Sequence, residues 1–486
     1  MRGGPRGAAR GGERASRYAL RVSIPLPPVA LYIHLPFCVA RCPYCDFTVY
    51  AGSDARGPRA RTERLYGAVA RELELRADAL DERFGAPAAG SAATPRRPAA
   101  GPAAPTAAPT AAPTAAPTAG SAAPAAAPTT GSAAPAVPPG RAARQPLRTV
   151  YFGGGTPSLV PGEWLERLMA VVRARYGVAP DAEVTIEANP GPDERGDPAA
   201  FRRVGVTRIS FGAQSLSAAE LRRLGRRHSP ADVAAAVAGA RAAGIESVNL
   251  DLLYDVPGQS VGDWETTLRA ALALAPDHLS LYALTLDDPE AEGIAGTGGD
   301  HLPTAPGARR WRERARLEQD DDRAADQYVL ATEMLASAGW RGYEISNWAR
   351  PGHESRHNLV YWEREPYEAV GPGAHAFDGV VRRWNAAAME PYVAALTPAG
   401  GAGRSAIPPG GSETLDEPTA QAEAAILALR LDRGLPAAAA SGPFAAHFDW
   451  ARSSGLLELI EIAGEPRLRL TTRGRLLGNE LFARLV

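Results

Sequence analysis

Short apolar runs that alternate with helical stretches most strongly constrain how this chain folds. The runs, each of which ends in polar or glycine residues, are Val29–Leu35, Thr149–Phe152, Glu183–Ile186, Arg208–Phe211, Ser247–Leu250 and His278–Leu281. Helical stretches separate them at Arg61–Phe84, Trp164–Tyr176, Ala218–Leu224, Pro230–Ala243 and Gly262–Leu274. This alternation predicts a parallel sheet with crossover helices. Because eight units would close a barrel, six predict an open, partial α/β barrel with its chemistry at the carboxyl ends of the strands.

The three cysteines of the chain all follow the first apolar run, within eight positions. Cys38, Cys42 and Cys45 have the spacing C-x3-C-x2-C, and three thiols cannot pair off into disulfides. Thiolates are soft ligands that hold iron–sulfur clusters or zinc. The favoured interpretation is a four-iron cluster with one iron left open for a small molecule. The alternative is a zinc site that takes His34 as its fourth ligand.

Composition bounds the classes of protein to which this chain can belong. The formal net charge of −1 provides no overall positive field for nucleic acid. We find no apolar run near the 18 or so residues that a transmembrane helix needs. Residues 1–24 are rich in Arg and Gly but lack the apolar core of a secretory signal, so we expect a disordered tail. A reduced cysteine cluster favours the cytoplasm.

The remaining segments suggest further domains around a barrel at residues 25–292. Residues 85–146 are nearly all Ala, Pro, Thr, Gly and Ser, which predicts a disordered insert within the barrel. Residues 293–400 form a less regular α+β extension, with a helix expected at Asp326–Ala338 and a strand at Trp340–Trp348. Residues 412–486 resemble a small winged-helix module, for which a packing role is the simplest interpretation.

The string YIHLPFCVARCPYCDF, at Tyr32–Phe47, resembles the cysteine motif of the radical S-adenosylmethionine (SAM) proteins. Within them it is similar to the family of oxygen-independent coproporphyrinogen III oxidases and HemW-type heme chaperones. The resemblance implies a partial (β/α)6 radical SAM barrel and a [4Fe–4S] cluster on the three cysteines. In that family SAM chelates the open iron. One electron from the reduced cluster then splits SAM into methionine and a 5′-deoxyadenosyl radical.

Strings at the other strand ends carry the same resemblance. By it, GGGTP, IEANP, FGAQS, LGRRH and NLDLLYDVP imply SAM contacts from Gly154, Gly155, Thr156, Glu187, Gln214, Arg226 and Asp251. Tyr32 matches the family's aromatic residue near the sulfonium, Tyr44 the residue beside the adenine, and Thr285 a further adenine neighbour. A guanidinium suits the SAM carboxylate, and carboxylates suit its amine and ribose hydroxyls. Each residue alone could be an ordinary polar residue at a strand end.

Two departures separate the branches of this family. The oxidases carry a fourth cysteine two residues after the third, where this chain has Phe47. The string HNLVYW, at His357–Trp362, fits the motif associated with heme binding in the chaperone branch. The resemblance thus implies a heme site with His357, Tyr361 and Trp362. His357 and Tyr361 would share a face in a helix or in a strand.

These observations lead us to expect a heme chaperone that binds a [4Fe–4S] cluster, SAM and heme. It would deliver heme to heme-accepting proteins, respiratory and membrane-associated ones among them, from the cytoplasm or the inner face of the membrane. A homodimer and productive SAM cleavage stay open. One alternative is oxidative decarboxylation of coproporphyrinogen III, against which Phe47 argues. The other is a nucleic-acid- or protein-binding module through the C-terminal domain; the neutral overall charge argues against DNA.

Overall fold

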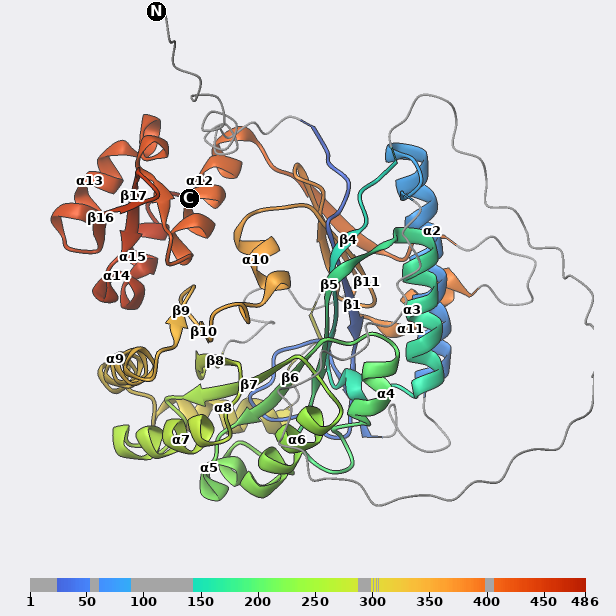
Figure 1. Ribbon diagram of the computed structural model, residues 1–486, viewed down its shortest axis with the longest axis horizontal. Helices are drawn as coiled ribbons and strands as arrows, with labels where there is room; N and C mark the ends of the chain where they lie inside the picture. Colours follow the sequence, from blue (N-terminus) through green and yellow to red (C-terminus); the bar gives the residue numbers. More distant parts are fainter. Residues whose placement is uncertain are drawn as a thin grey trace, which may run out of the picture.

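The computed structural model describes residues 24–52, 61–88, 143–286, 299, 301–302, 304, 306–397 and 406–486. Residues 1–23 of the predicted tail and residues 89–142 of the predicted insert lie outside the described residues. Figure 1 shows a curved sheet with long helices along its outer face and a small domain at the C-terminus.

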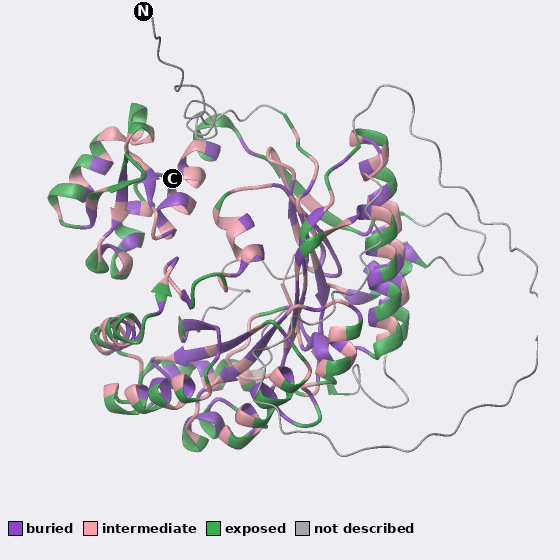
Figure 2. Ribbon diagram, viewed as in Figure 1, coloured by how far each residue is buried: buried purple, intermediate pink, exposed green. Residues whose placement is uncertain are grey.

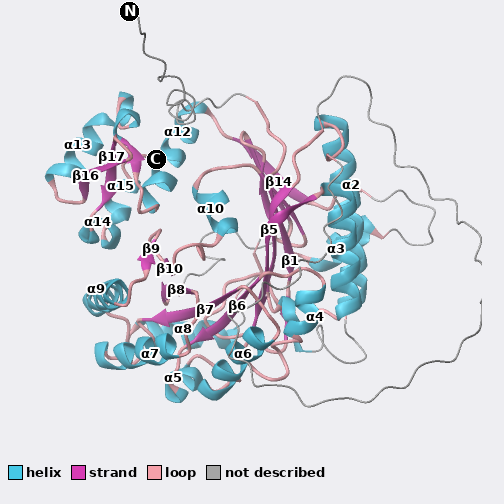
Figure 3. Cartoon of the chain, viewed as in Figure 1, coloured by secondary structure: helices cyan, strands magenta, loops and turns pink. Residues whose placement is uncertain are grey.

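A mixed sheet of twelve strands organises the described part of the chain, in the order β14-β13-β12-β11-β1-β4-β5-β6-β7-β8-β10-β9. The predicted six parallel strands are β1 (Ala30–Leu35), β4 (Leu147–Gly154), β5 (Val178–Ala188), β6 (Arg208–Gln214), β7 (Ser247–Tyr254) and β8 (His278–Ala283). The open, partial α/β barrel predicted from the sequence is confirmed (Figure 3).

The crossover helices also follow the predicted pattern. They are α2 (Thr62–Phe84), α3 (Gly162–Tyr176), α4 (Pro198–Arg203), α5 (Ala218–Arg223), α6 (Pro230–Ala242) and α7 (Val261–Ala273). Helices α6 and α7 each begin with a complete capping box, made by Ser229 with Asp232 and by Ser260 with Asp263. Such a box satisfies backbone N–H groups that the first helical turn leaves without partners. The cap serines therefore fix where these helices start.

Alternation along the strands separates the core from the barrel interior. On β4, Val150 and Phe152 are fully buried against the helix layer, and Tyr151 between them points into the barrel. Strands of a parallel sheet covered on one face by helices bury long apolar runs in this way. Figure 2 shows the strands as mostly buried and the outward faces of the helices as exposed. Polar side chains of the strands that point away from the helices, such as Tyr151, lie on the inner, concave face of the sheet.

The C-terminal extension contributes to this same sheet. Strand β11 (Tyr367–Val370) pairs parallel with β1, and β12 (His375–Phe377), β13 (Val381–Asn385) and β14 (Gly410–Thr414) continue antiparallel from it. Helices α8 (Pro306–Arg316), α9 (Asp321–Ser337), α10 (Arg356–Trp362) and α11 (Met389–Leu396) also belong to the extension. Helix α9 confirms the helix expected at Asp326–Ala338. The extension is thus continuous with the sheet of the barrel.

The single strand predicted at Trp340–Trp348 is wrong. This stretch is a hairpin of β9 (Arg341–Gly342) and β10 (Asn347–Ala349), which pair antiparallel. The Tyr343 N–H donates to the carbonyl of Asn347 at 3.2 Å, and the Ser346 N–H donates to the Glu344 carboxylate at 3.0 Å. These bonds reverse the chain between the two strands.

Both ends of the predicted insert are ordered where the structure describes them. Pro87 and Arg144 form an isolated parallel bridge, and Arg144 is buried. The Arg144 guanidinium donates to the carbonyl of Gly85 at 2.6 Å and forms an ion pair with Asp81 on α2. Residues 85–88 and 143–146 therefore pack as part of the barrel.

The C-terminal residues form a small domain with its own core. Helices α12 (Glu417–Arg430), α13 (Ala445–Ser453), α14 (Thr472–Leu476) and α15 (Gly478–Phe482) surround a sheet of β15 (Leu435–Pro436), β17 (Glu465–Leu470) and β16 (Leu457–Ile462). The winged-helix assignment stays a prediction. Within the described residues, no helix is both long and apolar enough to cross a membrane.

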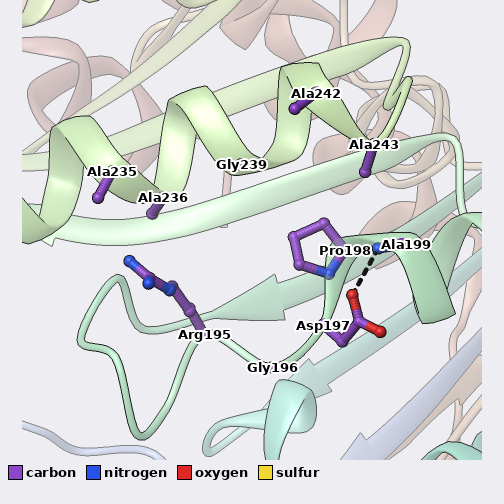
Figure 4. Close-up of a pocket in the computed structure, with 10 residues that line it drawn as sticks. All are labelled: Arg195, Gly196, Asp197, Pro198, Ala199, Ala235, Ala236, Gly239, Ala242 and Ala243. Carbon is purple, nitrogen blue, oxygen red and sulfur yellow. Dashed lines mark hydrogen bonds between the residues drawn. The ribbon is translucent and has the colours of Figure 1, made fainter.

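A groove of about 470 Å³ lies on the outer layer, between α6 and the loop that leads into α4 (Figure 4). Asp197 turns its carboxylate onto the N–H of Ala199 at 2.9 Å, which closes one end of the loop. The groove contains none of the predicted site residues; its lining is Arg195, Gly196, Asp197, Pro198, Ala199, Ala235, Ala236, Gly239, Ala242 and Ala243.

Candidate functional site

The cysteine loop begins where β1 ends. Cys38 lies on the short strand β2 (Phe37–Cys38), which pairs parallel with β3 (Tyr50–Ala51). The loop between them turns at Cys42, whose carbonyl accepts from the Cys45 N–H at 3.2 Å. The three thiols are free, and Cys38 is buried. The loop therefore lies at the carboxyl end of the parallel strands.

Two side chains, one after β4 and one after α5, reach this loop. The Thr156 hydroxyl donates to Cys38 Sγ at 3.4 Å, and Arg226 Nη1 donates to Cys42 Sγ at 3.5 Å. Asn189 links the two, because its amide nitrogen lies 3.1 Å from the Thr156 hydroxyl and its oxygen 2.5 Å from Arg226 Nη2. Asn189 stands in the string IEANP, two residues beyond Glu187, and was not among the predicted site residues. Its place beside Glu187 was the only available signal.

The glycines of GGGTP let two backbones approach each other. The Gly155 N–H donates to the carbonyl of Leu35 at 3.0 Å, and a Cβ on Gly155 would meet the carbonyl oxygen of Phe37 at 2.7 Å. Gly154 has a φ of +117°, a conformation that L side chains rarely adopt. The turn is therefore held against the root of the cysteine loop.

Two partly buried carboxylates, Glu187 and Asp251, lie below this turn. Glu187 accepts from the Tyr151 hydroxyl at 2.8 Å and from the Gly154 N–H at 2.9 Å. Burial, and to a smaller degree the charge of Asp251, raises the pKa of Glu187 to about 7. Asp251 accepts from the Ser210 hydroxyl at 3.0 Å, and burial raises its pKa as well. The two carboxylates thus offer acceptors to a cationic or hydroxyl-bearing ligand.

An arginine from the extension shapes the cysteine loop. Arg312, on α8, is 2% exposed and donates to three successive carbonyls, those of Pro43 at 3.1 Å, Tyr44 at 3.2 Å and Cys45 at 2.9 Å. The Tyr44 ring lies 6.4 Å from that of Trp311 on the same helix. Sequence reasoning missed Arg312, because an Arg-rich helix 267 residues after Cys45 gives no local signal.

Electrostatics of the thiols suit a positively charged inorganic centre. Burial raises the pKa of Cys38 to about 11, and burial together with the neighbouring thiols raises that of Cys45 to about 12. Without a cation these groups keep their protons at neutral pH. A metal centre has to displace those protons, because thiolates are the ligating form.

The arrangement suits a cluster better than one zinc ion. Among the described residues, no three His, Cys, Asp or Glu side chains gather closely enough to hold one metal ion. A single zinc needs its sulfur ligands about 2.3 Å from one point, whereas the thiolates of a four-iron cluster bind different irons. His34 is engaged elsewhere, with its ring nitrogens 3.1 Å from the Tyr32 hydroxyl and 3.0 Å from the Thr48 carbonyl. The donor set therefore fits a [4Fe–4S] cluster on Cys38, Cys42 and Cys45.

Helix α10 places His357 inside the barrel. The imidazole is 1% exposed, and its Nδ1 lies 2.8 Å from the Thr149 hydroxyl and its Nε2 2.8 Å from the Tyr361 hydroxyl. Its ring centroid is 5.0 Å from those of Tyr151 and Tyr361. Burial lowers the pKa of His357 to about 3, so the ring is neutral. Both ring nitrogens have partners in this position.

The start of α10 is held by a further carboxylate. Glu183, on β5, accepts the N–H groups of Arg356 and His357, each at 3.0 Å. The Ser355 hydroxyl caps the helix by accepting from the Asn358 N–H at 3.3 Å. Sequence reasoning placed Glu183 in a strand but gave it no role.

The predicted site residues do not form one group. The Trp362 ring packs 4.6 Å from the guanidinium of Arg430 on α12. Tyr32 lies inside the barrel between the two sites, 6.0 Å from the Tyr151 ring and 6.4 Å from the His357 ring. Gln214 ends β6 with a φ of +65°. The structure thus brings together His357 and Tyr361 in one group and Thr156, Arg226 and the cysteines in another.

Comparisons with known proteins agree with this geometry. A family model described as the Radical SAM superfamily matches residues 140–271. A protein named heme chaperone HemW from Mycobacterium tuberculosis (strain CDC 1551 / Oshkosh) is 35% identical over 464 residues, which cover 95% of this chain and 96% of that protein. The chain belongs to the HemW family. The HemW of Escherichia coli (strain K12) is 33% identical over 354 residues, 72% of this chain and 71% of that one.

A solved structure confirms the fold of this HemW-family chain. The coproporphyrinogen III oxidase HemN of Escherichia coli, described as a radical SAM enzyme, superposes with a TM-score of 0.66 at 19% identity. The match covers 98% of this chain and 93% of that one. Membership of the radical SAM superfamily implies a [4Fe–4S] cluster and SAM. When bound, that pair supplies one-electron cleavage of the SAM C–S bond. The residues of this chain would hold the cluster, orient SAM and exclude water.

Proposed function

We propose that this chain is a heme chaperone. It would hold a [4Fe–4S] cluster on Cys38, Cys42 and Cys45, bind SAM between the cysteine loop and the strand ends, and bind heme through His357. The heme would then pass to heme-requiring proteins, respiratory ones at the membrane among them. Heme is cargo in this proposal and takes no part in the SAM chemistry.

The HNLVYW helix is the observation that carries the proposal. It brings His357 and Tyr361 together on one face, with the Tyr151 ring beside them. A neutral histidine is the commonest proximal ligand of heme iron in globins and peroxidases, and aromatic rings pack on porphyrin faces. Phe47, which is 62% exposed, stands where the oxidases have a fourth cysteine. Both features support a chaperone over an oxidase.

Heme binding requires α10 to move. His357 is 1% exposed, and its Nδ1 lies 2.8 Å from the Thr149 hydroxyl on β4. A porphyrin therefore reaches the imidazole only when α10 leaves its place against β4. In the described conformation the hydroxyls of Tyr361 and Thr149 satisfy the two ring nitrogens of the histidine.

The test uses the anaerobically reconstituted full chain. One sample is titrated with heme, and a second receives coproporphyrinogen III, SAM and a reductant. We expect a shifted Soret band in the first, altered in His357→Ala while the cluster absorbance stays normal. Because burial of the porphyrin also contributes affinity, the axial ligation seen by spectroscopy is the decisive readout. Conversion of coproporphyrinogen III without heme binding would replace this proposal with the oxidase function.

A further inference from the structure

A chain of buried hydrogen bonds connects Asp251 to the start of α10. The Ser355 N–H donates to the Tyr343 hydroxyl at 3.2 Å, which lies 2.8 Å from His278 Nε2. His278 Nδ1 lies 2.6 Å from Asn249 Oδ1, and Asn249 Nδ2 donates to the Asp251 carboxylate at 2.7 Å. The chain thus runs from Asp251, within β7 and at the predicted SAM pocket, across β8, to the residue that caps α10.

All the donors in this chain point the same way. Asn249 gives its amide N–H to Asp251, so its oxygen must accept from His278. His278 is fully buried, and its lowered pKa keeps the ring neutral with a single N–H. That N–H is on Nδ1, so Nε2 accepts from the Tyr343 hydroxyl, whose oxygen is left to accept from Ser355. A change at Asp251 therefore alters the orientation that each later member needs.

The far end of the chain holds the helix that carries His357. The Ser355 N–H has Tyr343 as its acceptor, while the Ser355 hydroxyl caps α10. Heme binding requires α10 to leave its docked position, which breaks the bond between Ser355 and Tyr343. Asp251 and the heme motif are thus connected through His278 and Tyr343, to which the sequence analysis gave no role.

We propose that His278 and Tyr343 are positioning residues that couple the SAM pocket to the docking of α10. This inference rests on the proposed function, because it takes Asp251 as a SAM contact and α10 as the heme helix. SAM on Asp251 keeps that carboxylate an ionised acceptor and removes water from it. Hydrogen bonds in a drier, less polarisable site are stronger, and chains of them reinforce one another. SAM therefore tightens α10 in its docked place, and heme and SAM oppose each other's binding reciprocally.

The test measures backbone hydrogen exchange by mass spectrometry in the reconstituted full chain, with and without SAM and without heme. SAM should slow exchange in the peptide that spans 355–362 at least threefold in the wild type. Tyr343→Phe removes the acceptor of Ser355 and the donor to His278, and it should abolish this SAM effect. Tyr328→Phe is the matched control: its hydroxyl donates to the carbonyl of Ile345, beside the same hairpin but outside the chain, and the SAM effect should persist.

The outcomes separate this inference from the proposed function. Protection of the peptide that contains Gly153–Thr156 reports SAM binding itself. If SAM protects that peptide but leaves 355–362 unchanged in the wild type, the coupling is refuted while SAM binding stands. An equal SAM effect in Tyr343→Phe also refutes it. If no peptide responds to SAM, the SAM part of the proposed function fails, and the coupling fails with it.

Discussion

The Tyr361 hydroxyl competes with heme for His357, so Tyr361→Phe should bind heme more tightly than the wild type. With α10 docked against β4, this hydroxyl is 2.8 Å from His357 Nε2, and the Thr149 hydroxyl is at the same distance from Nδ1. Removing the hydroxyl leaves a buried ring nitrogen without its partner only while α10 is docked. Iron ligation then restores a partner to that nitrogen.

The size of the effect follows from the cost of one lost hydrogen bond. A buried acceptor without a partner costs about 1–3 kcal/mol, and that cost falls on the docked state alone. The lower figure corresponds to about a fivefold gain in heme affinity, and the upper one to more than a hundredfold. We therefore expect at least about a fivefold gain, measured by heme titration of the Soret band under anaerobic conditions.

Tyr367→Phe is the matched control for this prediction. The Tyr367 ring packs on that of Tyr361 at a centroid distance of 4.6 Å. The substitution removes one hydroxyl beside Tyr361 but leaves the bond between Tyr361 and His357 in place. This variant should bind heme as the wild type does. Heme affinity in Tyr361→Phe equal to or below that of the wild type would refute the competition, since it would mean that His357 is not released to ligate iron.

Four further predictions concern the barrel. Because burial raises the pKa of Glu187 to about 7, SAM affinity should rise about tenfold from pH 6 to pH 8 as the carboxylate ionises. In equilibrium dialysis, Glu187→Gln should flatten that rise. The same pH dependence in the variant would show that Glu187 does not contact SAM. The raised pKa also means that Glu187 favours the folded state at low pH and loses that contribution between about pH 4.5 and 7, so the same variant should be relatively more stable at pH 8. Arg312→Ala should lower the iron retained after reconstitution at least twofold. Arg314→Ala, on the exposed side of α8, is the control and should retain iron as the wild type does. Equal retention in both variants would show that the cysteine loop keeps its conformation without Arg312. Replacement of residues 89–142 by a short Gly/Ser loop should leave the unfolding temperature within a few degrees of the wild type. A deletion that also removes Arg144 should lower the free energy of unfolding by about 1–3 kcal/mol, because Asp81 loses a buried partner. Identical unfolding of both deletions would contradict the role of Arg144.

Local pattern was sufficient for the barrel and for the cysteine loop. An apolar run indicates a strand such as β7. A serine followed three positions later by an acidic residue indicates the start of helices α6 and α7. The three cysteines needed only their spacing. The position of Glu187 at the carboxyl end of β5 followed from the alternation of strands and helices, whereas Arg226, which follows α5, came from the resemblance alone.

Contacts between distant segments were beyond the reach of local pattern. The hairpin of β9 and β10 reverses through bonds within it, but its place against β8 depends on a long-range bond between Tyr343 and His278. Arg312 and Glu183 act on residues more than 170 positions away, and no periodicity encodes such a pair. The contact between Trp362 and Arg430 likewise depends on where α12 packs.

Heme transfer tests the central claim most directly. The reconstituted chain is loaded with one equivalent of heme, freed of excess, and mixed with a heme-free acceptor protein whose holo form has a distinct spectrum. The account predicts that heme passes to the acceptor from the wild type, and that His357→Ala shows altered ligation and impaired transfer with its cluster intact. Heme that stays on the wild-type chain, or transfer from His357→Ala at the wild-type rate and with the same ligation, would contradict the claim that this chain is a heme chaperone acting through His357.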